Sequence, residues 1–159
     1  MPRGGEPAKS CAPNDVPAAT RRLQRELKST REALGQLRAE AAERLARVEL
    51  DRLAASAERY SVMVLPDTPI DVARKVAASI ATRPNTLVVV GAELEAGVQV
   101  VVTRGEGSSV PCGDVLKRLA QLAGGRGGGR PERAEGRLPS GVDLPALVEQ
   151  ALGELELTW

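Results

Sequence analysis

Residues 60–104 read YSVMVLPDTPIDVARKVAASIATRPNTLVVVGAELEAGVQVVVTR, and this stretch decides the fold. Three of its segments are β-branched and apolar, and we expect them to be strands: YSVMVL, TLVVVGA and GVQVVVTR. Between the first two, apolar residues recur at helical spacing, at Ile70, Ala73, Val76, Ala77 and Ile80. The order is therefore β-α-β-β. The intervening helix makes the first two strands parallel neighbours, and the short ELEAG joins the last two as a hairpin.

Two further helices are predicted after these strands. The first, CGDVLKRLAQLA, turns its apolar residues inward and ends at Gly124, because glycine readily adopts the left-handed conformation that closes a helix. The second, DLPALVEQALGEL, begins at Asp143, whose carboxylate can cap it. Residues 60–159 are therefore predicted to be an α/β domain, a small mixed β-sheet packed by helices.

The chain before residue 60 is predicted to be extended. Residues 1–14 are rich in Pro, Gly and small polar residues and predict a disordered tail. Residues 15–59 predict a long helical arm, with Asn14 or Asp15 as its cap. A coiled-coil-like stripe runs along it through Leu27, Thr30, Leu34, Leu37 and Ala41, and after a one-residue slip through Leu45, Val48, Arg52 and Ala55. Because Gly35 costs about 1 kcal/mol relative to Ala in a helix, a helical hairpin that turns there is the alternative to the single arm.

Composition excludes several classes of function. The net charge is +1, so any attraction to a polyanion has to come from local clusters. Cys11 and Cys112 lie far apart in the chain, which argues against a disulfide and favours a reducing compartment. Cys112 has no evident base beside it and is predicted to be structural. No stretch approaches the roughly 20 apolar residues of a membrane span, so we expect a cytoplasmic protein that does not bind membranes.

The segment between the last two helices, GGRGGGRPERAEGRLPSG at residues 124–141, is predicted to be a glycine-arginine loop. Five of its first six residues are glycine, which implies that the backbone passes very close to another surface. Its spacing is that of a phosphate-binding loop, but Arg130-Pro131 replaces the Lys-Ser/Thr pair, and the loop follows a helix instead of a strand. A nucleotide-hydrolysing loop and a dinucleotide-binding fingerprint are both excluded.

Charge makes this loop a candidate anion site. From Lys117 to Arg137 six basic residues stand against two acidic ones, and at the start of the arm five stand against two. Guanidinium groups suit phosphate oxygens, and backbone amides beside glycines can form an anion-binding nest. The structural alternatives are a flexible linker and a solvated helix face with ion pairs four residues apart. The predicted RNA-binding residues are Gly124, Gly125, Arg126, Gly127, Gly128, Gly129, Arg130, Pro131, Arg133, Lys117, Arg21 and Arg25.

At this loop the sequence resembles the DHH-associated domain that closes alanyl-tRNA synthetases. The family pattern is a helix, then GGxGGGRP, then D-x-A-Q-A-G-G, and this chain matches its first half through Pro131 and again at Ala134. It departs from the second half, with Glu132 for Asp, Glu135 for Gln and Gly136-Arg137 for the paired glycines. Upstream, CAPNDVPAATRRLQREL resembles the start of the helical linker that precedes this domain, so the resemblance begins near residue 11.

The resemblance implies a module that binds the outer corner of tRNA and helps present it to the aminoacylation and editing domains. Its expected partners are the tRNA for alanine and alanyl-tRNA synthetase. Editing domains and DHH phosphoesterases depend on histidines for metal binding, and this chain has none. It is also too short for an aminoacylation domain, so we expect no catalytic residue, metal or cofactor.

Two questions stay open from the sequence. The arm can instead make the chain an assembly module that pairs weakly with itself or with a synthetase. The sequence also fits either a free-standing protein or a piece of a full synthetase.

Overall fold

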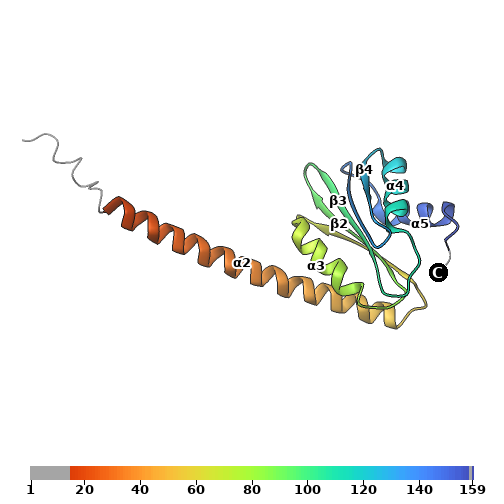
Figure 1. The fold of residues 1–159 in the computed structure, drawn as a ribbon, viewed down its shortest axis with the longest axis horizontal. Helices are drawn as coiled ribbons and strands as arrows, with labels where there is room; N and C mark the ends of the chain where they lie inside the picture. The colour runs from red at the N-terminus through yellow and green to blue at the C-terminus, as the bar shows by residue number, and fades with distance from the viewer. Residues whose placement is uncertain (1–14, 158) are drawn as a thin grey trace, which may run out of the picture. The chain divides into compact units, whose positions relative to one another are not determined.

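A computed structural model describes residues 15–157 and 159, and for Asp15 the backbone alone. The predicted tail at residues 1–14, with Asn14 and Cys11 in it, lies outside the described residues. The chain divides into two compact units, Met1–Arg38 and Ala39–Trp159. The described part of the first unit is helical, and the second unit holds the β-sheet (Figure 1). No helix in residues 15–157 combines the length and apolar character needed to cross a membrane.

The second unit is built on a five-stranded mixed sheet, so the predicted α/β fold is confirmed. The elements of the chain are α2 (Asp15–Ala54), β1 (Tyr60–Pro66), α3 (Ile70–Ile80), β2 (Leu87–Leu94), β3 (Gly97–Arg104), α4 (Cys112–Ala123), β4 (Arg126–Gly129), β5 (Arg133–Leu138) and α5 (Leu144–Glu154). The strands lie in the order β1-β2-β3-β5-β4. β1 and β2 are parallel, and the other neighbouring strands are antiparallel. The predicted parallel pair and the predicted β2–β3 hairpin are therefore both present.

Helices cover both faces of this sheet (Figure 1). Successive side chains of a strand point to opposite faces, so Val88 and Val90 pack with α3, while Leu87 and Val89 pack with α4 and α5. Both layers are almost wholly aliphatic, because the chain has no Phe, one Trp and one Tyr. Burial of each valine or leucine stabilises the fold by about 1.5–3 kcal/mol.

The predicted helix ends are also confirmed. Helix α4 is closed by Gly124, whose φ of +79° is the left-handed conformation that glycine adopts without strain. Helix α5 is capped by Asp143, whose Oδ1 accepts a hydrogen bond of 3.2 Å from the amide of Ala146. Both ends were predicted from the residue type alone, because capping depends on local chemistry.

Helix α2 corrects one alternative for the arm and has a buried face that the sequence did not predict. It continues through Gly35 as one helix, so the alternative hairpin is wrong. The second half of the predicted stripe does not face the sheet, since Leu45 is 37% exposed and Val48 is 70% exposed. The residues that pack against α3 and the sheet are Ala42, Ala46 and Leu53, about 100° away round the helix. Small alanines allow close packing here, but they give only a weak hydrophobic signal in the sequence.

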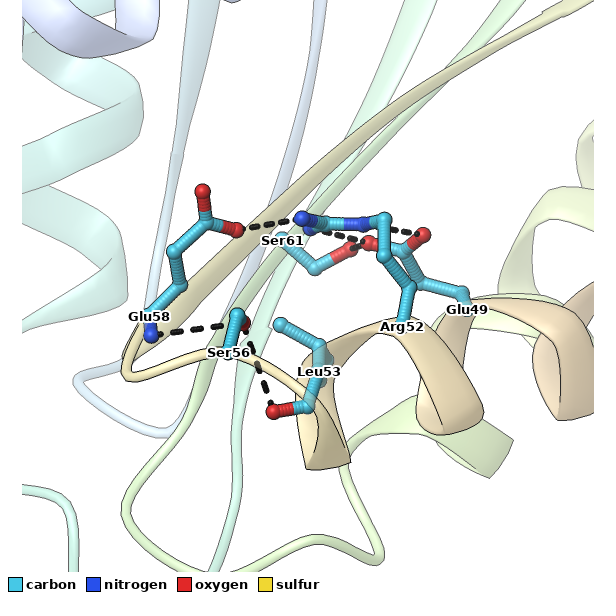
Figure 2. Close-up of polar contacts among 6 residues, drawn as sticks. All are labelled: Glu49, Arg52, Leu53, Ser56, Glu58 and Ser61. Atoms are coloured by element: carbon cyan, nitrogen blue, oxygen red, sulfur yellow. Dashed lines mark hydrogen bonds and ion pairs between the residues drawn. The ribbon is translucent and has the colours of Figure 1, made fainter.

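A buried carboxylate ties the last turns of α2 to the first strand (Figure 2). Glu49 is 8% exposed, and it accepts hydrogen bonds from Ser61 of β1 at 2.5 Å and from Arg52 at 2.8 Å. Arg52 also donates to Glu58 at 2.5 Å, in the segment between helix and strand. Burial raises the pKa of Glu49, but the hydrogen bonds from Arg52 and Ser61 outweigh it and hold the pKa below its usual value. Arg52 is therefore part of this network and does not belong to an apolar seam.

The buried face of α2 can be tested with two leucines of the same helix. We expect Leu53→Ala to lower the free energy of unfolding by about 2–5 kcal/mol, because it leaves a cavity in the core. Leu45→Ala is the matched control and should change stability by less than about 0.5 kcal/mol. Urea unfolding followed by circular dichroism measures both values. Equal losses would show that the buried face has been assigned wrongly.

Candidate nucleic-acid interface

The segment predicted to be a glycine-arginine loop forms a β-hairpin, so that prediction is wrong in its local structure. β4 pairs with β5, and β5 pairs with β3, which places the hairpin at the edge of the sheet. The glycines gave no alternation of apolar and polar side chains, and glycine has a low preference for strands. Pairing with β3 overrides that weak local preference.

The glycines allow the hairpin to lie close to the rest of the domain. A Cβ atom added to Gly129 would lie 2.5 Å from Cα of Ala134 in β5. One added to Gly127 would lie 2.8 Å from Cδ2 of Leu116 in α4 and 3.0 Å from Cα of Gly136. The predicted close approach is therefore real, but the surface that the backbone approaches belongs to this chain.

The turn of the hairpin is fastened to the start of α4. The amide of Cys112 donates to the carbonyl of Pro131 at 2.9 Å, and the amide of Gly113 donates to that of Arg130 at 3.1 Å. These amides would otherwise be free donors at a helix N-terminus. Within residues 124–138 a positive φ occurs at Gly124 alone, and β4 is extended. The glycines of β4 therefore do not form an anion-binding nest, which requires a turn or left-handed conformation.

The register of the hairpin decides which way its side chains point. Because Gly127 faces α4, its neighbours Arg126 and Gly128 face the opposite side of the sheet, where α3 packs. Cross-strand partners share a face, and Arg126 lies directly opposite Arg137. Glu135, opposite Gly128, lies on that face as well.

Glu135 is already neutralised by the chain's own arginines. Arg74 of α3 donates to it at 2.8 Å, and Arg133 donates to it at 2.9 Å. The hydrogen bond from Arg74 is the main reason that the pKa of Glu135 is lowered; burial opposes it and Arg133 adds to it. The only acid among these side chains is thus engaged by two cations.

Arg126 and Arg137 are both exposed, and within residues 15–157 and 159 neither has a carboxylate partner. Beside them Gly128 is open, since a Cβ added there would meet no atom within 4 Å. We call Arg126, Gly128, Arg133 and Arg137 the arginine face. Arg137 is missing from the predicted site, because only the strand register brings it opposite Arg126.

The remaining hairpin residues lie on more than one side. Arg130 is exposed in the turn and lines a shallow open depression together with Gly128 and Arg133 of the arginine face. Lys117 is exposed on α4, the helix that covers the opposite side of the sheet. The structure therefore brings Arg130 beside the arginine face and separates Lys117 from it.

The predicted basic residues of the first unit lie on one side of α2. Arg21, Arg25 and Lys28 recur at helical spacing and line one shallow hollow on α2. Around them the predicted ion pairs four residues apart are also present, at 3.9 Å for Arg22–Glu26 and for Lys28–Glu32. Such exposed pairs contribute at most about 0.5 kcal/mol each.

Cys112 is buried beneath the hairpin turn, and its thiol donates to the carbonyl of Glu132 at 3.5 Å. Burial raises the pKa of this thiol to about 11, so the nucleophilic thiolate is scarce at neutral pH. Among the described residues no group of three or more His, Cys, Asp or Glu side chains is placed to hold a metal ion.

These features define an α/β domain whose sheet ends in a glycine-rich, arginine-bearing edge hairpin. Residues 58–156 match the model of the DHHA1 domain, and the chain belongs to this family. The domain is homologous to the C-terminal C-Ala region of alanyl-tRNA synthetase.

Relatives and solved structures support this assignment. The chain is 32% identical over 117 residues to the alanine–tRNA ligase of Bdellovibrio bacteriovorus and 39% identical over 70 residues to that of Pseudomonas entomophila. These matches cover 61% and 43% of this chain, but 12% and 8% of the ligases, so the chain spans a small part of their length.

The fold is similar to that of the C-Ala domain from Aquifex aeolicus alanyl-tRNA synthetase, with a TM-score of 0.53 and 19% identity over 57% of this chain and 85% of that one. RecJ from Thermus thermophilus, solved in complex with Mg²⁺, has a TM-score of 0.54 and 19% identity over 75% of this chain and 19% of that one.

Adjacent glycines in β4 allow a direct test of the packing. We expect Gly129→Ala to lower the free energy of unfolding by about 1–3 kcal/mol, because the new methyl group would clash with the backbone of β5. Gly128→Ala has open space and should leave stability within about 0.5 kcal/mol of the parent. Thermal or urea unfolding measures the stability of both variants. A loss for Gly128→Ala as large as that for Gly129→Ala would contradict the open space at Gly128.

The buried thiol gives a pH prediction. In a Cys11→Ser background, alkylation of Cys112 by iodoacetamide should be far slower in the folded protein than in urea at pH 8, because burial protects the thiol and keeps it protonated. The folded state holds this proton more tightly than the unfolded state, so its contribution to stability is complete below pH 9.0 and is lost as the pH rises towards about 11. Rapid labelling of the native protein at pH 8 would refute the assignment.

Proposed function

We propose that this chain binds folded RNA, with the tRNA for alanine as the first candidate, through the arginine face of the β4–β5 hairpin. The observation that carries the proposal is the directly opposed pair Arg126 and Arg137, exposed and without a carboxylate partner in residues 15–157 and 159. Like charges directly opposite each other destabilise a sheet. A bound phosphate would offset that repulsion.

The chemistry of the arginine face suits a sugar-phosphate backbone. Guanidinium groups bind phosphate oxygens through paired hydrogen bonds, and Arg133 and Arg130 flank the same open surface. Gly128 carries no side chain, and a Cβ added there would meet no atom within 4 Å, so the surface beside these arginines is open. Five arginines stand against two acids on and around this surface, an excess of three positive charges: Arg74, Arg126, Arg130, Arg133 and Arg137 against Glu132 and Glu135.

Recognition by base stacking has little support here. Tyr60 and Trp159 are the two aromatic residues of the chain, and their rings stack on each other with centroids 6.1 Å apart. Readers of single strands stack bases on exposed aromatic rings. The proposed binding therefore reads RNA shape and phosphate position, which is how proteins recognise folded RNA.

The other predicted residues are proposed as auxiliary contacts. Arg130 would extend the arginine face, while Arg21 and Arg25 would give the first unit its own phosphate contacts. Lys117 would contribute from the α4 side of the sheet. We propose no catalytic step for this chain: its role would be to assist aminoacylation or editing by alanyl-tRNA synthetase.

A second candidate function is assembly, in which the chain associates weakly with another copy of itself. The observation that favours it is a row of exposed leucines on the first unit: Leu23, Leu27, Leu34 and Leu37. Exposed apolar rows of this kind commonly mark interaction surfaces.

The RNA proposal predicts a specific loss in two variants. Arg126→Ala and Arg137→Ala should each weaken tRNA binding and lower the slope of log K against log salt by about one, because each removes one phosphate contact. Fluorescence anisotropy with the tRNA for alanine, a second tRNA and duplex DNA at two salt concentrations measures both effects.

Arg59→Ala is the matched control. Arg59 is an exposed arginine immediately before β1, at the edge of the sheet farthest from β4. Its loss should leave affinity and salt slope near the parent values. If all three variants bind alike, or if binding is independent of salt, the arginine face is not the site.

A further inference from the structure

A row of three polar side chains crosses the sheet at the arginine face. Gln99 of β3 lies directly opposite Arg137 of β5, and Arg137 lies directly opposite Arg126 of β4. Cross-strand partners share a face of the sheet, so all three side chains are on the same side. Neighbouring strands lie about 4.8 Å apart, so the row spans roughly 10 Å. We call Gln99, Arg137 and Arg126 the polar row; its inner end is a neutral amide.

The side-chain amide of Gln99 makes no hydrogen bond within the part of the chain that the structure describes, although the residue is only partly exposed. An unmet donor or acceptor in such a position costs free energy, so the amide favours a partner from outside the chain. Thr103 is the other neutral polar residue that β3 places on this face, and its hydroxyl donates to the carbonyl of Glu132 at 3.4 Å. Of these two polar groups, the Gln99 amide is therefore the one available to a ligand.

A small hollow adjoins the polar row at the start of β3. It has a volume of about 80 Å³, and Gln99 and Arg137 line it together with Leu94 and Leu138. Such a volume holds roughly two or three groups the size of a water molecule. The hollow therefore admits a sugar hydroxyl and the carbon that carries it, while a whole nucleobase is too large.

A ribose 2′-hydroxyl is the group that fits this combination. The hydroxyl both donates and accepts hydrogen bonds, and the glutamine amide offers an acceptor oxygen and donor hydrogens. Arginine only donates, so Arg126 and Arg137 suit phosphate oxygens instead. The strand spacing of about 4.8 Å puts the amide within reach of the sugar beside a phosphate held by Arg137. The polar row therefore matches a sugar next to a phosphate, which is the repeating unit of an RNA backbone.

We propose that Gln99 gives the RNA site its preference for RNA over DNA, by hydrogen bonding to the 2′-hydroxyl of a ribose whose adjacent phosphate is held by Arg137. The inference rests on the proposed binding of folded RNA and adds to it the residue that reads the sugar. The 2′-hydroxyls of an A-form helix are displayed in its wide, shallow minor groove, where the edge of a sheet can reach them. Without this contact the arginines would hold either backbone, because RNA and DNA present the same phosphates.

Gln99→Ala tests the hydroxyl contact. Fluorescence anisotropy measures binding to the tRNA for alanine and to two transcripts of the same sequence, one with 2′-fluoro pyrimidines and the other with 2′-fluoro purines. Fluorine keeps the sugar in the A-form pucker, but it cannot donate a hydrogen bond and accepts one only weakly. We expect Gln99→Ala to weaken binding of the unmodified tRNA by roughly two- to tenfold, the effect of one neutral hydrogen bond. On at least one modified transcript the variant and the parent should bind alike.

Thr103→Val is the matched control. Thr103 lies on the same strand and the same face, but its hydroxyl is already bonded within the chain, so its loss should leave the affinity for every transcript near the parent value. If Gln99→Ala loses the same factor on every transcript, or loses nothing on the unmodified tRNA, the inference is overturned while RNA binding stands. A parent chain that binds none of the transcripts would overturn the proposed function and the inference with it.

The salt dependence of binding separates this neutral contact from those of the arginines. Gln99→Ala should leave the slope of log K against log salt at the parent value, because a neutral side chain releases no counterion. Gln99→Glu has nearly the same shape, but its carboxylate would lie beside Arg137 and neutralise it, so the slope should fall by about one. A Gln99→Glu variant with the parent slope would separate Gln99 from the phosphate contact of Arg137 and overturn the inference.

Discussion

The close approach of the β4 and β5 backbones beneath α4 is the constraint on which the candidate site depends. A side chain at Gly127 or Gly129 would occupy the space now filled by Leu116 or by the backbone at Ala134. The same approach lets the carbonyls of the hairpin turn accept hydrogen bonds from the first amides of α4. The hairpin at the sheet edge and the start of α4 therefore pack as one unit. Their backbone polar groups form hydrogen bonds with one another.

This packing divides the hairpin into two faces with different roles. On the face beneath α4 the glycines allow the backbone to pack directly against the hydrophobic core. The other face carries Arg126 and Arg137, and its one glycine without a close neighbour is Gly128. The pattern of glycines and arginines along the chain is thus the alternation of a strand, with close packing on one side and charge on the other.

The departures from the family pattern find a physical explanation in the same register. Glu135 stands where the resemblance implies a glutamine, and its added negative charge is compensated by Arg74 and Arg133. Arg137 stands where the resemblance implies a glycine, and it faces Arg126 across the strands. The second half of the motif has therefore gained an acid that is salt-bridged and a cation that has no carboxylate partner among the described residues, with no change in its net charge.

The amino-acid sequence by itself determined the β-α-β-β order, the parallel β1–β2 pair, the inward faces of α3 and α4 and the caps at Gly124 and Asp143. These features follow from short-range periodicity and local hydrogen bonding, which a single segment carries within itself. Only the tertiary structure decided that residues 126–138 are two strands and that Arg137 lies opposite Arg126. It also decided that Ala42, Ala46 and Leu53 form the buried face of α2. These outcomes depend on which other segment of the chain packs against each residue. Glycine and alanine have small side chains, so they produce little hydrophobic periodicity from which that packing could be predicted.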